Sequence, residues 1–121
     1  MSLKITSSEV DGVVLVALSG RIILGEESTA LREKLKSLVA AGKQKIVLNM
    51  AEIGYIDSAG LGALVAAHLS AKNAGGSIRL CNLGDKFHEV LQLTKLLTVF
   101  DVYDTEAAAV ASFPTSLAAG N

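Results

Sequence analysis

The sequence predicts an α/β domain built on a small mixed, mostly parallel β-sheet of four to five strands with about four helices. Short apolar runs alternate with longer segments of helical periodicity, which is typical of right-handed parallel crossovers. Before them, two apolar runs are joined by Asp11-Gly12, a hairpin signal that adds one antiparallel strand. The 121 residues show no internal repeat or linker, so we expect a single domain.

The first part of the chain is expected to form a hairpin and an amphipathic helix. Strands are predicted over Leu3–Val10 and Val13–Leu18, and the second is apolar on both faces, which places it inside the sheet. Glu27 or Ser28 leads into a helix over Ala30–Val39. The apolar stripe of this helix comprises Leu31, Leu35, Leu38 and Val39.

The remaining strands are predicted at Lys45–Met50, Ser77–Cys81 and Val99–Tyr103. A loop from Ala51 is expected to carry the chain to Asp57, where the central helix begins.

Two further helices follow the central one. Asp85 is expected to cap a short helix that runs to Leu93, and Thr105 with Glu106 to open an alanine-rich helix that ends at Phe113-Pro114. We therefore expect a domain over residues 3–113 and a disordered tail over residues 114–121.

Composition excludes several classes of function. Eleven basic and twelve acidic side chains give a net charge of −1 without a Lys/Arg cluster, so we expect no nucleic-acid partner. The longest uncharged stretches, 58–71 and 107–121, fall short of the ~18 residues that suggest a membrane span, so we expect no membrane association. The single Cys81 fits a reducing compartment, and no signal peptide is apparent. These features predict a cytoplasmic protein.

The most unusual stretch opens with the pair Asp57-Ser58, behind which the next ten positions carry no charge. Asp57 is expected to be the N-cap and Ser58 the first helical residue, because a short side-chain oxygen can accept from the free N–H groups of the first turn. Gly60 and Gly62 each cost a helix about 1 kcal/mol relative to alanine, so we expect another surface to approach closely here.

This helix is apolar all round, and such a helix is normally buried on both of its sides. The core-facing stripe is predicted to be Leu61, Leu64, Val65, His68 and Leu69. The opposite side offers the small residues Ala59, Gly60, Gly62, Ala63, Ala66 and Ala67, which a partner protein could cover.

The residues around Ser58 do not match the motifs of a serine enzyme, a dinucleotide-binding site or a zinc site. A Gly-x-Ser-x-Gly elbow needs a glycine where Ile56 stands, and His68 lies about 15 Å further along the helix. A dinucleotide fingerprint needs a small residue where Val65 stands. One cysteine and two histidines are too few ligands for a structural zinc site. We expect no catalytic residue, cofactor or metal; a plain helix cap at Asp57 is the simplest alternative.

The chain resembles the STAS family, specifically the bacterial anti-sigma-factor antagonists. The resemblance runs almost end to end, and Asp57-Ser58-x-Gly60-Leu61-Gly62 is its most specific part. It also includes Leu31 to Leu35, Ile46 to Asn49, Tyr55 to Gly62, Gly75-Gly76 and Phe100. The family fold implied is a small mixed sheet with helices packed mainly on one side.

The resemblance implies a switch at Ser58. In the family the matching serine is phosphorylated by an anti-sigma factor that is itself a GHKL-type serine kinase, and a metal-dependent serine/threonine phosphatase removes the phosphate. The unphosphorylated form binds the anti-sigma factor and frees the sigma factor for transcription. The partner-binding residues expected here are Arg21, Ile23, Asp57, Ser58, Ala59, Gly60, Leu61, Gly62 and Ala63.

Two departures from the family pattern concern this surface. Ala59 replaces the frequent Ser or Thr, and Gly20-Arg21-Ile22-Ile23 replaces the more usual Gly-Glu-Leu-Asp. The alternative function is a STAS module that works without phosphorylation, as a scaffold in a signalling assembly or as an accessory subunit of a lipid or anion transporter. Such a module could keep Asp57-Ser58 as a helix cap alone.

Overall fold

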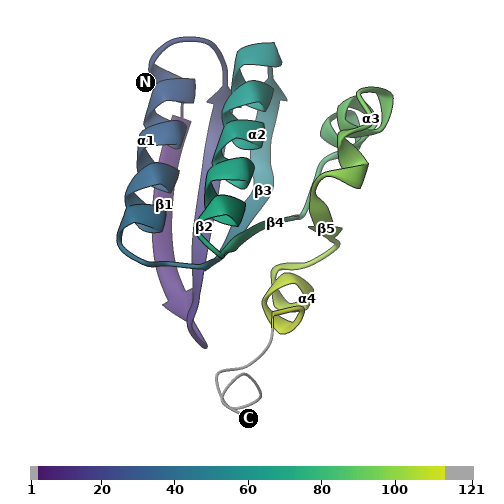
Figure 1. Cartoon of the computed structure of the whole chain (residues 1–121). Helices are drawn as coiled ribbons and strands as arrows, with labels where there is room; N and C mark the ends of the chain where they lie inside the picture. The colour runs from purple at the N-terminus through teal and green to yellow at the C-terminus, as the bar shows by residue number, and fades with distance from the viewer. Residues whose placement is uncertain (1–2, 114–121) are drawn as a thin grey trace.

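The structure is a computed structural model that describes residues 3–113. Its five-stranded sheet has the order β1-β2-β3-β4-β5 (Figure 1). β1 pairs antiparallel with β2, whereas the other neighbours pair in parallel. The strands are β1 Leu3–Val10, β2 Val13–Ile22, β3 Lys45–Ile56, β4 Ser77–Cys81 and β5 Asp101–Tyr103. The predicted mixed, mostly parallel sheet is confirmed.

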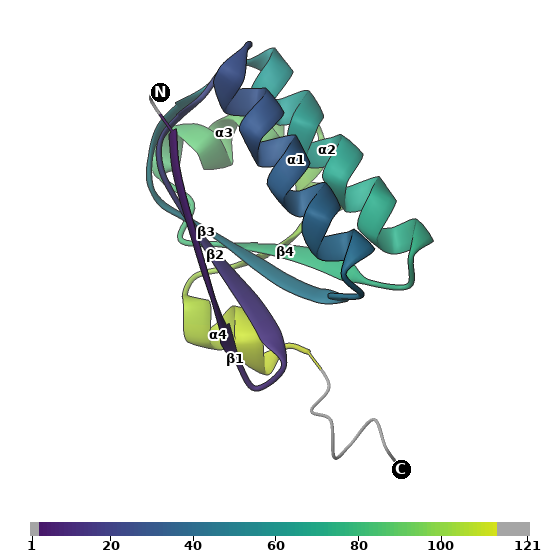
Figure 2. The ribbon, with the colours of Figure 1, turned by 90° about the vertical axis from the view of Figure 1, so that its left-hand side faces the viewer.

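The helices lie mainly on one face of the sheet. α1, α2 and α3 cover that face and α4 lies against the other (Figure 2). The helices are α1 Glu26–Ala40, α2 Ser58–Asn73, α3 Asp85–Leu93 and α4 Glu106–Ala111, with a 3₁₀ turn η1 at Leu96–Thr98. Within residues 3–113, none of these helices combines the length and the apolar character that crossing a membrane requires. The tail predicted over residues 114–121 falls outside the described residues.

β3 is longer than the sequence suggested. The predicted loop from Ala51 to Asp57 is wrong, because the chain stays paired with β2 as far as Ile56, which lies opposite Ile22. β2 likewise continues beyond the predicted end at Leu18. Two register shifts accommodate the glycine-containing part of this pairing. As a result, Asp57 leaves β3 directly beside the end of β2.

Three helix starts test the capping predictions. α1 begins at Glu26, before the predicted start at Ala30. α3 is preceded by Gly84 as its cap, so Asp85 lies in the first turn instead of capping it. Thr105 caps α4 as predicted, since its hydroxyl oxygen accepts a first-turn N–H at 3.1 Å.

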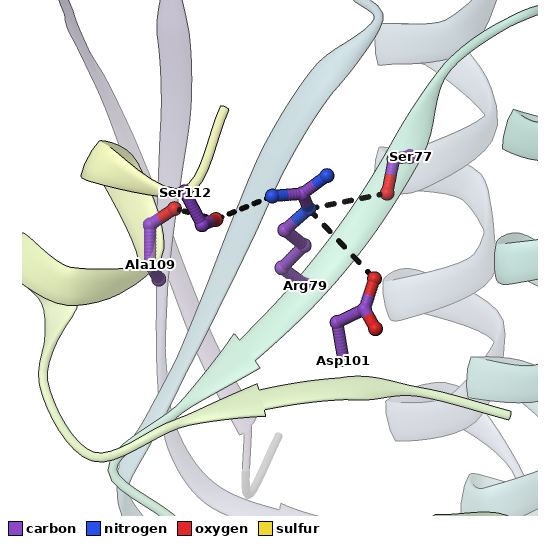
Figure 3. Close-up of polar contacts among 5 residues, drawn as sticks. All are labelled: Ser77, Arg79, Asp101, Ala109 and Ser112. Carbon is purple, nitrogen blue, oxygen red and sulfur yellow. Dashed lines mark hydrogen bonds and ion pairs between the residues drawn. The ribbon is translucent and has the colours of Figure 1, made fainter. Parts of the chain in front are cut away.

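Arg79 of β4 fastens α4 to the sheet. Its guanidinium carbon lies 3.9 Å from the centroid of the Phe113 ring. The guanidinium also donates to the Ser112 hydroxyl (Figure 3). Ser112 in turn donates to the Ala109 carbonyl, and Asp101 lies 3.9 Å from the Arg79 Nε. These contacts border a small second hydrophobic core between α4 and the sheet, so this face of the sheet serves to pack α4.

Cys81 belongs to that second core. The thiol is fully buried, and burial, together with the charge of Glu106, raises its pKa to about 11. Cys81 is therefore protonated near neutral pH and packs as a small buried apolar residue.

His68 of α2 is buried in the main core. Its ring lies 5.2 Å from the Phe100 ring, centroid to centroid, and its Nδ1 has no hydrogen-bond partner among the described residues. Burial lowers the pKa of His68, and the nearby positive charge of Lys72 acts in the same direction.

This burial predicts an acid-sensitive stability. Below the ordinary histidine pKa of 6.5 the unfolded chain binds a proton that folded His68 resists, so the free energy of unfolding should fall as the pH drops. The slope contributed by one group is at most about 1.4 kcal/mol per pH unit. Urea unfolding at pH values above and below 6.5 measures it. His68→Gln should remove much of this loss of stability at low pH, whereas His88→Gln, at an exposed position, should retain it. Equal pH dependence of the free energy of unfolding in the parent and both variants would contradict the prediction.

Candidate functional site

Asp57 joins the start of α2 to the loop that precedes α1. Its Oδ1 accepts from the Gly60 N–H at 2.8 Å, which is the predicted N-cap bond. Its Oδ2 accepts from the Leu24 N–H at 2.9 Å, and its own N–H donates to the Ile22 carbonyl at 3.2 Å. The bond from Gly60 and then that from Leu24 hold the pKa of Asp57 below its usual range, so the carboxylate is ionised at neutral pH.

Ser58 is the first residue of α2 and is exposed. An anion at this position would meet the positive end of the helix dipole and the free N–H groups of the first turn, although the Asp57 carboxylate would repel it. His68 is buried in the core and is not available to activate this hydroxyl as a base. Within residues 3–113 no group of three or more His, Cys, Asp or Glu side chains could hold a metal ion. The exposed position at the start of α2 suits the Ser58 hydroxyl as an acceptor of a transferred group.

Gly60 and Gly62 have different roles. A Cβ atom at Gly60 would lie 2.1 Å from the Ile22 carbonyl oxygen, so α2 meets β2 at the Gly60 backbone. A Cβ atom at Gly62 would meet nothing within 4 Å. The close approach expected from the glycines therefore exists at Gly60, but it is made by the domain itself.

The predicted core-facing side of α2 is partly wrong. Gly60, Ala63 and Ala67 are buried, whereas Leu69 is 53% exposed. Leu64 and His68 are buried as predicted, and small residues pack inward beside them because they let the helix approach its neighbours closely. Gly60 and Ala63 were predicted as partner contacts, but the protein's own chain covers both residues, so the surface proposed below does not include them.

The outward face of α2 borders an open apolar groove, which we call the α2 groove. Its volume is about 490 Å³, and the residues of α2 that line it recur at helical spacing along one face, with Ser58 at its end. The lining comprises Ser58, Leu61, Gly62, Val65, Ala66 and Leu69 of α2 with Thr94 and Leu96. The sequence could have shown this face, since Ser58 shares its helical period with Leu61, Val65 and Leu69.

The end of β2 and the loop before α1 bring further residues to the start of α2. Arg21 is exposed and Ile23 is half-buried, and both precede Leu24, whose N–H binds Asp57. Leu24 is 76% exposed and was not among the predicted partner contacts. No sequence signal separates it from Ile22, which is equally apolar and fully buried.

Comparison with known proteins identifies the family. The STAS domain family model matches residues 4–109, nearly all of the described structure. The chain belongs to the STAS domain family. In this STAS domain, the match includes β2, β3 and α2, the elements that position Ser58.

Relatives of this STAS domain resemble it over almost their whole length. BtrV of Bordetella bronchiseptica, provisionally named an anti-sigma factor antagonist, is 29% identical over 115 residues, which are 95% of this chain and 98% of BtrV. The anti-sigma-B factor antagonist of Bacillus subtilis is 28% identical over 102 residues, 84% of this chain and 92% of the relative.

Solved structures share the fold. The Bacillus anti-sigma factor antagonist SpoIIAA matches with a TM-score of 0.70 in its unphosphorylated form, at 20% identity over 89% of this chain and 96% of SpoIIAA. Its phosphorylated form also matches with a TM-score of 0.70, at 19% identity over 89% of this chain and 97% of SpoIIAA. Both forms of SpoIIAA therefore share the architecture of this STAS domain.

Proposed function

We propose that this STAS domain is an anti-sigma-factor antagonist whose activity is switched by phosphorylation of Ser58. The unphosphorylated domain binds an anti-sigma factor that is itself a GHKL-type serine kinase, and the captured anti-sigma factor releases its sigma factor for transcription. The observation that carries the proposal is the exposed Ser58 hydroxyl at the end of the apolar α2 groove. The names of BtrV and of the Bacillus subtilis relative support the class of partner.

The covalent step requires only an acceptor from this domain. The Ser58 Oγ attacks the γ-phosphorus of ATP, the Oγ–P bond forms, the bond to the bridging oxygen breaks and ADP leaves, while the hydroxyl proton passes to a base of the kinase. A metal-dependent serine/threonine phosphatase then directs water to the phosphorus, which restores the hydroxyl and releases inorganic phosphate.

The proposed docking surface is the α2 groove together with the start of α2, the end of β2 and the loop before α1. Of the predicted contacts it keeps Arg21, Ile23, Asp57, Ser58, Ala59, Leu61 and Gly62, and it adds Leu24, Val65, Ala66 and Leu69. This surface suits an apolar partner face that surrounds the hydroxyl.

The phosphate acts by its charge at this interface. It adds about −1.5 to −2 charges at pH 7, and an uncompensated ion costs several kcal/mol to bury. Charge effects at a helix start amount to about 0.3–1 kcal/mol, which is too little to unfold α2. The equal TM-scores against the two forms of SpoIIAA support a switch that keeps the fold.

Phosphate transfer tests the proposal directly. Incubation with candidate GHKL-type anti-sigma kinases and ATP, followed by intact mass and site mapping, should place one phosphate on Ser58. Ser58→Ala should remove the label, whereas Ser70→Ala, at an exposed serine further along α2, should retain it. Absence of phosphate on Ser58 with every cognate kinase would favour the phosphorylation-independent scaffold or transporter subunit.

A further inference from the structure

Leu24 is an apolar side chain held in an exposed position. It is 76% exposed, although the residue two positions before it, Ile22, is fully buried. Ile22 is fixed through its carbonyl, which accepts from the Asp57 N–H, and Ile23 through its carbonyl, which accepts from the Ser28 N–H at 3.0 Å. At Leu24 the N–H donates to the Asp57 carboxylate.

The two oxygens of Asp57 therefore serve two different elements. Oδ1 accepts from Gly60 in a part-buried bond that caps α2, while Oδ2 accepts from Leu24 in a solvent-exposed bond. Capping needs only one oxygen. The second oxygen links the loop before α1 to the residue directly adjacent to Ser58.

We propose that Asp57 is a positioning residue that holds Leu24 as an apolar anchor for the anti-sigma partner, and that a phosphate on Ser58 breaks this hold. The inference rests on the proposed function and deepens it. The modification then acts twice, because it places charge at the groove and also releases an anchor from the loop.

Adjacency explains why the exposed bond is the one that breaks. A phosphate on Ser58 places its charge beside the Asp57 carboxylate, and its oxygens compete for the free N–H groups of the first turn. The carboxylate is repelled by this like charge. The Leu24 N–H is in contact with solvent, so water can replace its carboxylate partner, whereas the part-buried Gly60 bond has less access to water.

The substitution Asp57→Asn separates the two bonds. Asparagine is as good an N-cap as aspartate, so its carbonyl oxygen can still accept from Gly60. Its second terminal atom is an amide nitrogen, which donates and cannot accept from Leu24. Asp57→Ser serves as a second variant, because its single oxygen can cap the helix but cannot serve both donors.

Solvent-exchange NMR of backbone amides reads both bonds without a partner protein. In Asp57→Asn and Asp57→Ser, the Leu24 amide should exchange about tenfold or more faster than in the parent, with the Gly60 amide little changed. Phosphoserine installed at position 58 during translation should produce the same pattern without any kinase. The Ala108 amide, bound to the Thr105 hydroxyl at 3.1 Å on the other face, should be unchanged in every sample.

If the Leu24 amide exchanges equally slowly in the phosphoserine protein and in the parent, the proposal that phosphorylation breaks the bond from Leu24 to Asp57 is wrong. A parent-like Leu24 amide in both Asp57 variants would overturn the positioning role. Neither result depends on a kinase, so they are distinguishable from failure of the proposed function, which would appear as absence of phosphate on Ser58 in the kinase assay.

The anchor itself is tested by Leu24→Ser against the anti-sigma kinase. Affinity should fall about tenfold or more, as for an apolar interface anchor, while urea stability stays close to that of the parent because the side chain is exposed. If Leu24→Ser binds the kinase with the affinity of the parent, Leu24 is not an anchor for the partner.

Discussion

Phosphorylation of Ser58 is expected to weaken binding to the anti-sigma partner about a thousandfold. The phosphate would lie at the end of the α2 groove, and the described residues that line this groove include no basic side chain; Arg21 of the docking surface does not line it. Burial of an uncompensated ion costs several kcal/mol, and about 4 kcal/mol is sufficient for a thousandfold change in affinity. Isothermal titration or surface-based binding with the purified kinase, without ATP, measures the two forms of the protein.

Variants at Ser58 separate charge from loss of the hydroxyl. Ser58→Ala should bind the kinase as the unmodified parent does, and it should stay bound when ATP is added. Ser58→Asp should bind more weakly, by about tenfold, since one carboxylate carries roughly half the charge of the phosphate. Tight binding of the phosphorylated parent would contradict the mechanism, even if the phosphate were shown to be present on Ser58.

The order of the elements and the start of α2 could be predicted because their signals are local. Alternating apolar runs and helical segments define the order of the elements along the chain. An N-cap side chain bonds only within its own first helical turn, as Asp57 and Thr105 show. The end of β3 could not be predicted in this way. Residues beyond Met50 lack a clear apolar run, and they remain a strand because β2 lies beside them.

The inward face of α2 was predicted only in part, for a related reason: Leu64 and His68 are buried as predicted, but other positions differ. A helical wheel assigns the larger apolar residues to the core, but α2 meets β2 at a glycine and buries Ala63 and Ala67. Close packing therefore decided the orientation more than side-chain size did. Leu24 shows the same limit, because its backbone N–H donates to Asp57, which lies 33 positions away in the sequence.

Gly60→Ala is expected to destabilise the domain by roughly 3 kcal/mol, the upper end of the range for overpacked sites. The added methyl carbon would lie 2.1 Å from the Ile22 carbonyl oxygen and 2.8 Å from the Ile22 Cγ2 atom. The oxygen belongs to a backbone that is fixed by the Asp57 N–H and by pairing with β3, so it cannot yield as a flexible side chain would. Urea unfolding of parent and variant measures the loss.

Gly62→Ala is the matched control, because it adds the same atom two positions further along α2. Its methyl group meets nothing within 4 Å, so the usual preference of helices for alanine over glycine should apply and raise stability by up to about 1 kcal/mol. Two methyl groups on one helix should therefore differ by about 4 kcal/mol in their effect. Equal destabilisation by both would mean that helix flexibility, and not contact with β2, explains the glycines. Equal tolerance of both would mean that α2 does not approach Ile22 so closely.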